Sequence, residues 1–170
     1  MDAFLPWLEG SPLSLYVRGS ESIAFGFPGI LVLHTLGMGF LAGISFAIDL
    51  RILGFARGIS LSALRKFLPL FAVALVVNVV SGILLLIGYP TKALTNPVFY
   101  VKLLLIAGGL FLLQRIRREA FAPGLTFEPF PKNLRQIAIA SLICWMGAIT
   151  AGRFLAYTYT FLLYGHATRF

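Results

Sequence analysis

The sequence predicts an all-α membrane protein, a four-helix up-down transmembrane bundle with a short interfacial N-terminal segment. Hydrophobic residues make up 59% of the 170 residues and charged residues only 12%, and the mean hydropathy is +0.91. A soluble domain of this length needs more charge to cover its surface. Four apolar runs each reach the roughly 20 residues that a membrane-spanning helix requires. They leave no room for a second folded domain.

The expected organisation follows these runs. An interfacial segment covers residues 1–22, where Pro6 and Pro12 interrupt an amphipathic stretch with aromatic side chains suited to the headgroup region. The transmembrane domain covers residues 23–165, and a tail covers 166–170. The four spans are expected at about 23–50, 67–89, 97–114 and 137–163.

Local signals mark where several helices begin. Pro28 lies in the first turns of span one, where it either kinks the helix or marks its true start. Asn96 followed by Pro97 is typical of an N-cap and a first helical residue, so span three should begin there. Ser60 or Ser62 is the expected cap of a helix that leads into span two. The proline-rich segment 120–131 is predicted to be a loop.

The basic residues predict the orientation of the bundle. The chain has 14 Lys plus Arg against 6 Asp plus Glu, and most of the basic residues fall in the first and third loops. By the positive-inside rule these loops face the cytoplasm, so both termini lie on the non-cytoplasmic side. We therefore expect a multi-pass protein of the bacterial inner membrane. The basic balance is explained by membrane anchoring, and no nucleic-acid partner is expected.

Familiar catalytic and metal-binding motifs are absent from the sequence. It contains no Cys or His pairs at zinc spacing, no P-loop, no G-x-S-x-G and no c-type haem attachment site. The one cysteine, Cys144, lies in an apolar run and is interpreted as a core residue. Composition and motifs leave open whether the protein is an enzyme.

Ionisable residues within the spans carry the functional information, because burying them in hydrocarbon is costly. The three clear cases are His34, Lys102 and Arg153. Counted from the basic residue at the cytoplasmic end of each helix, at about 1.5 Å per residue, they lie roughly 25, 20 and 27 Å along their spans. Helical side chains lean toward the helix N-terminus, so the three tips should converge in the outer half of the bundle.

The convergence predicts a cationic site that an anion completes, because no acidic residue lies at this level. A haem propionate, a phosphate, a carboxylate or a quinone carbonyl would serve. Asn78, on the same face of span two as Ser81 and Gly82, is expected to line the site. Trp145 and Tyr157 are expected to line it from span four, on one face with Ile149 and Arg153.

Each of these residues also has a simpler explanation. Lys102 can snorkel to the outer interface, Arg153 can bond backbone carbonyls or Asn78, and His34 can be a neutral histidine bonded across the bundle. Asp49, at the cytoplasmic end of span one, is expected to pair with Arg51 or Arg65. His166 is expected at the surface.

Several stretches carry a family resemblance. DLRILG at 49–54 and GRFLAY at 152–157, together with LHTLG at 33–37, resemble a family of uncharacterised small bacterial four-span membrane proteins. More distantly, His34 in span one and Lys102 early in span three resemble HemJ-type protoporphyrinogen oxidases and copper-resistance D-type membrane domains. That resemblance implies a role for His34 in haem binding.

The pattern departs from this resemblance near the end of span three. Gln114 and Arg115 stand where a further histidine is expected, so a bis-histidine haem is not supported. Met38 lies one turn from His34 on the same face and is badly placed to ligate the opposite side of one haem. Met146 on span four is a possible second ligand.

The leading hypothesis is a protein that binds a b-type haem or a similar anionic redox cofactor in the outer half of the bundle. His34 would be the axial ligand, and Lys102 and Arg153 would neutralise propionates. Electron transfer, or redox chemistry with quinone or a porphyrin, would follow. The alternatives are a cofactor-free anchor or scaffold subunit of a larger complex and a small anion transporter. The expected partners are the lipid bilayer and other membrane subunits or a second copy of the chain.

Overall fold

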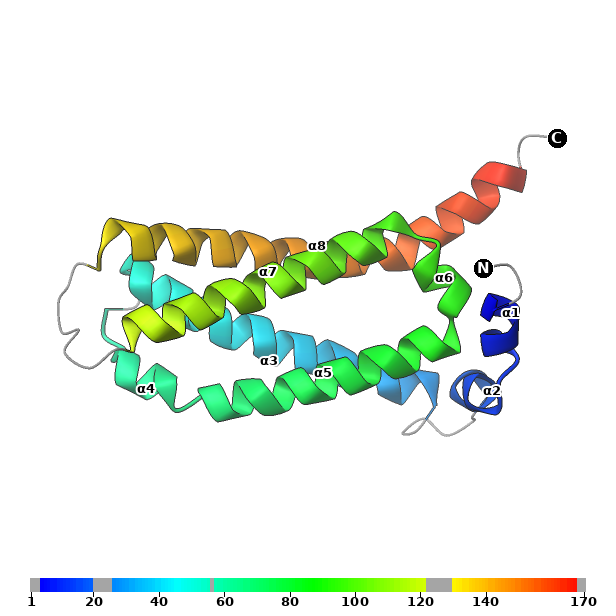
Figure 1. The fold of residues 1–170 in the computed structure, drawn as a ribbon, viewed down its shortest axis with the longest axis horizontal. Coiled ribbons are helices and arrows are strands. Elements are labelled where there is room, and N and C mark those ends of the chain that lie inside the picture. The colour runs from blue at the N-terminus through cyan, green and yellow to red at the C-terminus, as the bar shows by residue number, and fades with distance from the viewer. Residues whose placement is uncertain (1–3, 20–25, 56, 122–129, 168–170) are drawn as a thin grey trace.

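The predicted all-α membrane fold is confirmed. The computed structural model describes residues 4–19, 26–55, 57–121 and 130–167. Within them, four long helices run side by side: α3 (Phe27–Leu53), α5 (Leu68–Gly88), α7 (Pro97–Ala120) and α8 (Lys132–Ala167) (Figure 1). Four stretches are long and apolar enough to cross a membrane: Phe27–Leu53, Leu61–Gly88, Pro97–Ala120 and Lys132–Leu155.

Helix starts and stops follow local chemistry. Pro28 stands in the first turn of α3, so it marks the start of the helix, and Gly54 ends α3 in the left-handed conformation with φ 93°. Asn96 caps α7 as predicted, since its side chain accepts a hydrogen bond of 3.0 Å from the Val98 amide. Ser60 is the cap of the short helix α4 (Leu61–Arg65).

The span boundaries differ from the predicted ones mainly at the basic ends. Helix α7 continues through Arg115, Arg117 and Arg118 to Ala120, and α8 already begins at Lys132. The predicted spans stop where the apolar residues stop. The helices themselves continue for one or two further turns that carry basic residues. The predicted start of span one at residue 23 and most of the predicted loop 120–131 lie outside the described residues.

Two helix pairs build the bundle. Helix α3 packs on α5, α7 packs on α8, and α3 and α8 join the two pairs, whereas α5 and α7 have no comparable contact (Figure 1). Trp145 of α8 fills part of the space between α5 and α7. Its fully buried ring meets Phe71 of α5 edge-on at 6.3 Å and lies against Gly109 of α7.

Short helices cover one end of the bundle. Helices α1 (Phe4–Glu9), α2 (Pro12–Gly19) and α6 (Pro90–Leu94) lie at this end, called the α6 end below; α4 lies at the other, the α4 end. Val17 of α2 is buried against Gly88 of α5, and the Ser14 hydroxyl donates to the Gly88 carbonyl over 3.4 Å. The predicted interfacial segment therefore docks on the bundle, while Phe4 and Trp7 stay exposed.

Glycines set the close approach of the helices at some positions and face outward at others. A Cβ on Gly37 would lie 3.2 Å from the Asn78 Cβ and 3.3 Å from the Ala74 carbonyl oxygen, so α3 and α5 approach closely there. Gly39 and Gly43 have the small-xxx-small spacing of a packing pair, but both are exposed, and a Cβ on either would meet nothing within 4 Å. That pair does not pack inside this bundle.

Candidate functional site

His34 of α3 and Lys102 of α7 meet inside the bundle near its α6 end. Lys102 Nζ lies 3.3 Å from His34 Nε2, and both side chains are half-buried. The two residues come from helices in different packing pairs. Their contact therefore joins α7 to the α3–α5 pair, on the side where α5 and α7 lack a packed interface. The expected convergence of His34 and Lys102 is present.

The partners of His34 define its tautomer. Nδ1 lies 3.1 Å from the Asn78 carbonyl oxygen. A backbone carbonyl only accepts, so Nδ1 carries the hydrogen and donates it. Nε2 then bears a lone pair, which accepts a hydrogen bond from the Lys102 ammonium group. In metal-binding histidines one ring nitrogen commonly donates to a carbonyl in this way, and the other nitrogen binds the metal.

Helix α5 supplies the frame that holds the imidazole. The Asn78 side chain donates over 2.8 Å to the His34 backbone carbonyl, so the two residues bond each other reciprocally. The Ser81 hydroxyl lies 3.1 Å from Nδ1 and donates to the Val77 carbonyl. Gly82 leaves room for the ring, because a Cβ there would stand 3.1 Å from His34 Cε1. Asn78 thus lies at the site, as predicted.

The Lys102 side chain passes Gly152 of α8, which has no side chain to obstruct it. A Cβ on Gly152 would lie 3.6 Å from Lys102 Cε and 3.7 Å from Nζ. Lys102 therefore lies at the same level of the bundle as Gly152, the residue before Arg153. The ammonium group turns into the bundle toward His34 and is not directed along the helix to the surface.

Arg153 and Tyr157 lie on the outside of the bundle. Tyr157 is 68% exposed, Arg153 is also exposed, and neither contacts His34 or Lys102. The reason is geometric: steps of four residues advance about 40° beyond a full turn. A stripe that begins at the buried Trp145 therefore rotates toward the surface by Arg153 and Tyr157. The structure joins only His34, Lys102 and Asn78 among the six predicted site residues.

Trp145 is buried, but it lies nearer the middle of the bundle than the His34–Lys102 pair. It is 0% exposed, and its indole Nε1 has no hydrogen-bond partner. Its ring rests on Gly109, where a Cβ would come within 3.0 Å. Trp145 therefore fills the interior between α5, α7 and α8 and does not contact the pair.

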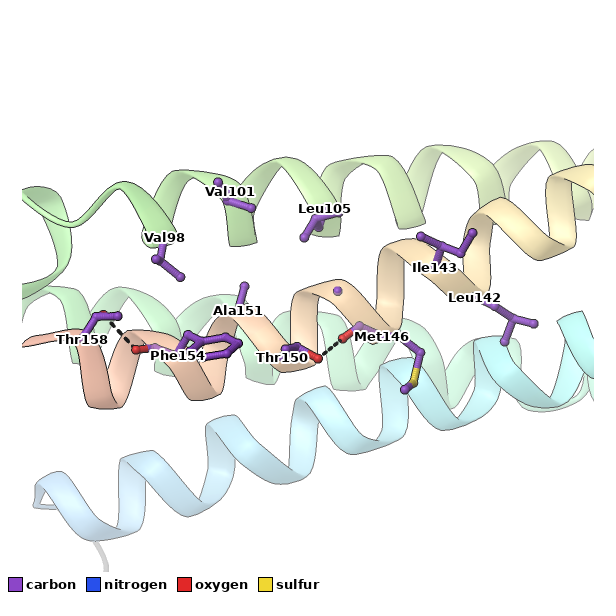
Figure 2. A pocket seen from close by; sticks show the side chains of 11 residues that line it. Val98, Val101, Leu105, Leu142, Ile143, Met146, Thr150, Ala151, Phe154 and Thr158 are labelled. Atoms are coloured by element: carbon purple, nitrogen blue, oxygen red, sulfur yellow. Dashed lines mark hydrogen bonds between the residues drawn. The ribbon is translucent and has the colours of Figure 1, made fainter.

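The candidate second haem ligands lie away from the imidazole. Met38 packs against the core, one turn from His34 on the same helix. Met146 is exposed and borders an apolar groove of about 650 Å³ between α7 and α8 (Figure 2). In Figure 2, Val98, Val101 and Leu105 face this groove from α7. The side chain of His166 lies outside the described part, within which no three His, Cys, Asp or Glu residues cluster as metal ligands.

The prediction that Asp49 pairs with Arg51 or Arg65 is wrong. Asp49 is 0% exposed, and neither carboxyl oxygen has a hydrogen-bond partner. Arg51 instead donates to the Ile59 carbonyl and lies over the Phe130 ring, and Arg65 is exposed. The sequence offered one signal, the spacing of four residues between Ser45 and Asp49, which places these two polar residues on the same face of an apolar helix.

The fold and this pair define the class of the protein: a four-helix membrane bundle with a polar site among its spans. The chain belongs to a family of unknown function (DUF6644), whose model matches residues 4–158. This agrees with the expected small uncharacterised membrane family. No curated protein and no solved structure matches the chain, so nothing in these comparisons supports the likeness to HemJ-type or copper-resistance D-type proteins.

Proposed function

We propose that this protein binds a b-type haem or a similar anionic redox cofactor at the His34–Lys102 pair. The observation that carries the proposal is the fixed imidazole. Nδ1 is bonded to the Asn78 carbonyl, and the lone pair of Nε2 accepts a hydrogen bond from the Lys102 ammonium group inside the bundle. When bound, such a cofactor supplies one-electron chemistry.

The residues present fit this cofactor in part. His34 would ligate the iron through Nε2, held in orientation by Asn78 and Ser81. Lys102 would leave Nε2 and neutralise a propionate, and its flexible side chain lies beside Gly152, which offers no obstacle. Arg153 and Tyr157 are exposed, so they would contact only a group that extends beyond the bundle.

The second axial position has no candidate ligand at His34 within the described residues. Met38 is on the same helix face, and Met146 borders the groove between α7 and α8. A haem would therefore be five-coordinate in this chain or take its second ligand from another subunit. A quinone would need no second ligand, because Lys102 could donate a hydrogen bond to its carbonyl oxygen.

A cofactor-free anchor subunit is the second candidate function, and one observation favours it. Gly39 and Gly43 lie one turn apart on the outer face of α3 with open space above them. Paired small residues on a lipid-facing helix surface allow another helix to approach closely. Under this alternative, the His34–Lys102 bond serves only to join α7 to the α3–α5 pair.

We further propose the bacterial inner membrane as the location, with the α4 end in the cytoplasm. Basic residues support this orientation. At the α4 end they are Arg51, Arg57, Arg65, Lys66, Arg115, Arg117, Arg118, Lys132 and Arg135. Near the α6 end, the N-terminal segment contributes Arg18 and α6 contributes Lys92. The asymmetry matches the positive-inside rule.

The cofactor is identified by extraction. Protein purified in detergent from haem-replete cells is extracted with acidified organic solvent, and the extract is analysed by chromatography and mass spectrometry. We expect close to one porphyrin or one quinone per chain, lost in His34→Ala and retained in His166→Ala. The matched control removes the other of the two histidines in the chain. An extract free of both compounds would reject the redox proposal and favour the anchor function.

A further inference from the structure

A second polar cluster lies deep in the bundle, toward the α4 end. Asp49 and Ser45 of α3 and Ser141 of α8 are each 0% exposed, and none of their side-chain oxygens has a hydrogen-bond partner within the described structure. Ser45 precedes Asp49 by one helical turn, and the Asp49 side chain leans toward it. The Ser141 hydroxyl faces the Asp49 carboxyl group from the neighbouring helix.

The two serines differ from the other hydroxyl residues of the spans. Thr35, Ser81, Thr150 and Thr158 all donate to the carbonyl one turn earlier in their own helix, which is the usual arrangement for a hydroxyl in a helix. Ser45 and Ser141 make no such bond. Their hydroxyls are therefore available to a group held between α3 and α8.

The charged groups around this position leave Asp49 without a counter-charge. On its own helix, Arg51 is engaged with Ile59 and Phe130. The basic residues on the neighbouring elements are all exposed: Arg65 of α4, Lys66 directly after it, Arg117 and Arg118 of α7, and Arg135 of α8. Glu119 of α7 faces Arg115 at 3.7 Å. The surroundings of Asp49 are otherwise the apolar core, which includes Ile48, Ile52 and Ala138.

Burying an ionised carboxylate in such a place costs roughly several kcal/mol of desolvation free energy unless its charge is neutralised. A proton or a metal cation would achieve this. Hard cations take about six or more oxygen ligands, whereas this cluster offers one carboxyl group and two hydroxyls. A single proton instead turns the carboxylate into an acid with one donor and remaining acceptors, which two serine hydroxyls can match.

We propose that Asp49, Ser45 and Ser141 form a proton-binding site inside the membrane span, in which Asp49 is a carboxylic acid at neutral pH. The hydroxyls bond the acid from one turn away and from the facing helix. The site is separate from the His34–Lys102 pair and does not depend on a cofactor there. It gives the bundle an exchangeable proton between its middle and its α4 end.

Infrared spectroscopy tests the site directly. The protein in lipid nanodiscs at neutral pH should show the carbonyl stretch of a protonated carboxylic acid, shifted downward in D₂O and lost in Asp49→Asn. Glu119→Gln is the matched control, because Glu119 is paired with an arginine, and the band should persist there. Absence of the band in the wild-type protein, or its survival in Asp49→Asn, overturns the proposal.

Two further measurements keep the result interpretable. Ser141→Ala removes one oxygen and should shift the band to higher frequency, because the acid loses a hydrogen bond; no shift contradicts the role of Ser141. If Asp49→Asn fails to fold, this shift still assigns the band to Asp49. Loss of the band on replacing KCl by NaCl would instead assign the site to sodium and reject the proton.

Discussion

His34 and Lys102 are coupled across two helix pairs by a hydrogen bond of 3.3 Å between Nζ and Nε2. The imidazole is fixed from behind by Asn78, so the lysine has a defined acceptor and does not simply extend along the helix surface. Each residue has a separate explanation when taken alone. The contact shows that they share one site, and it makes their energetic coupling measurable.

A double-mutant cycle should detect this coupling. His34→Ala and Lys102→Met, made singly and together, are expected to give an interaction energy of about 0.6 kcal/mol, the average for hydrogen bonds between membrane helices, and at most about 1.7 kcal/mol. The measurement is the free energy of unfolding in detergent. The matched cycle pairs His34→Ala with Lys132→Met, an exposed lysine at the start of α8, and should show coupling within about 0.3–0.5 kcal/mol of zero. Equal values in the two cycles would mean that the pair is not a bonded unit.

The position of each polar residue along its helix was predictable from the sequence, but the direction in which its side chain points was not. The helix rise is constant, so counting residues placed His34 and Lys102 at one level. Which side of a helix faces inward depends on how the helix is rotated against its neighbours. Arg153 and Tyr157 therefore lie outside, and Asp49 lies inside without the partner expected for it.

Glycine controls the separation of helices α3 and α5. Gly37 lies directly over the Asn78 and Ala74 backbone, two residues from Gly39, which faces open space. Residue spacing alone would select Gly39 and Gly43 as the packing pair. The glycine that packs is Gly37, because the face that meets α5 depends on how α3 is rotated.

The neighbouring glycines give a matched test. Gly37→Ala would place a methyl group about 3.2–3.3 Å from backbone and Cβ atoms that cannot move freely, and overpacking of this kind costs about 1–3 kcal/mol. Gly39→Ala adds the same methyl group in open space, where the better helix propensity of alanine stabilises by at most about 1 kcal/mol. Thermal unfolding followed by circular dichroism should show a lower midpoint only for Gly37→Ala. A similar decrease in both variants would contradict the α3–α5 packing.

The whole molecule is a lipid-embedded bundle with different chemistry at its two ends. Helix α4 and most of the basic residues lie at one end, and α1, α2 and α6 at the other. The apolar spans and the helix caps were predictable because both depend on local sequence. The docking of α2 on Gly88 was not, since it joins residues far apart in the chain.

The orientation of the bundle is tested by labelling single cysteines in intact cells. In a Cys144→Ser background, Thr95→Cys at the α6 end should react with a membrane-impermeant maleimide. Ser62→Cys in α4 should react only after the cells are opened. Both positions are exposed, so a difference reports the side of the membrane. Labelling of Ser62→Cys in sealed cells would reverse the proposed orientation.

In the proposed function, the fixed imidazole of His34 holds a redox cofactor. The most direct test is the visible absorption spectrum of the detergent-purified protein, oxidised and then reduced, beside His34→Ala and His166→Ala. For a b-type haem we predict a Soret band and sharp α and β bands on reduction, lost only in His34→Ala. A protein that is colourless after haem-replete expression, or an identical spectrum in His34→Ala, would contradict ligation of haem by His34.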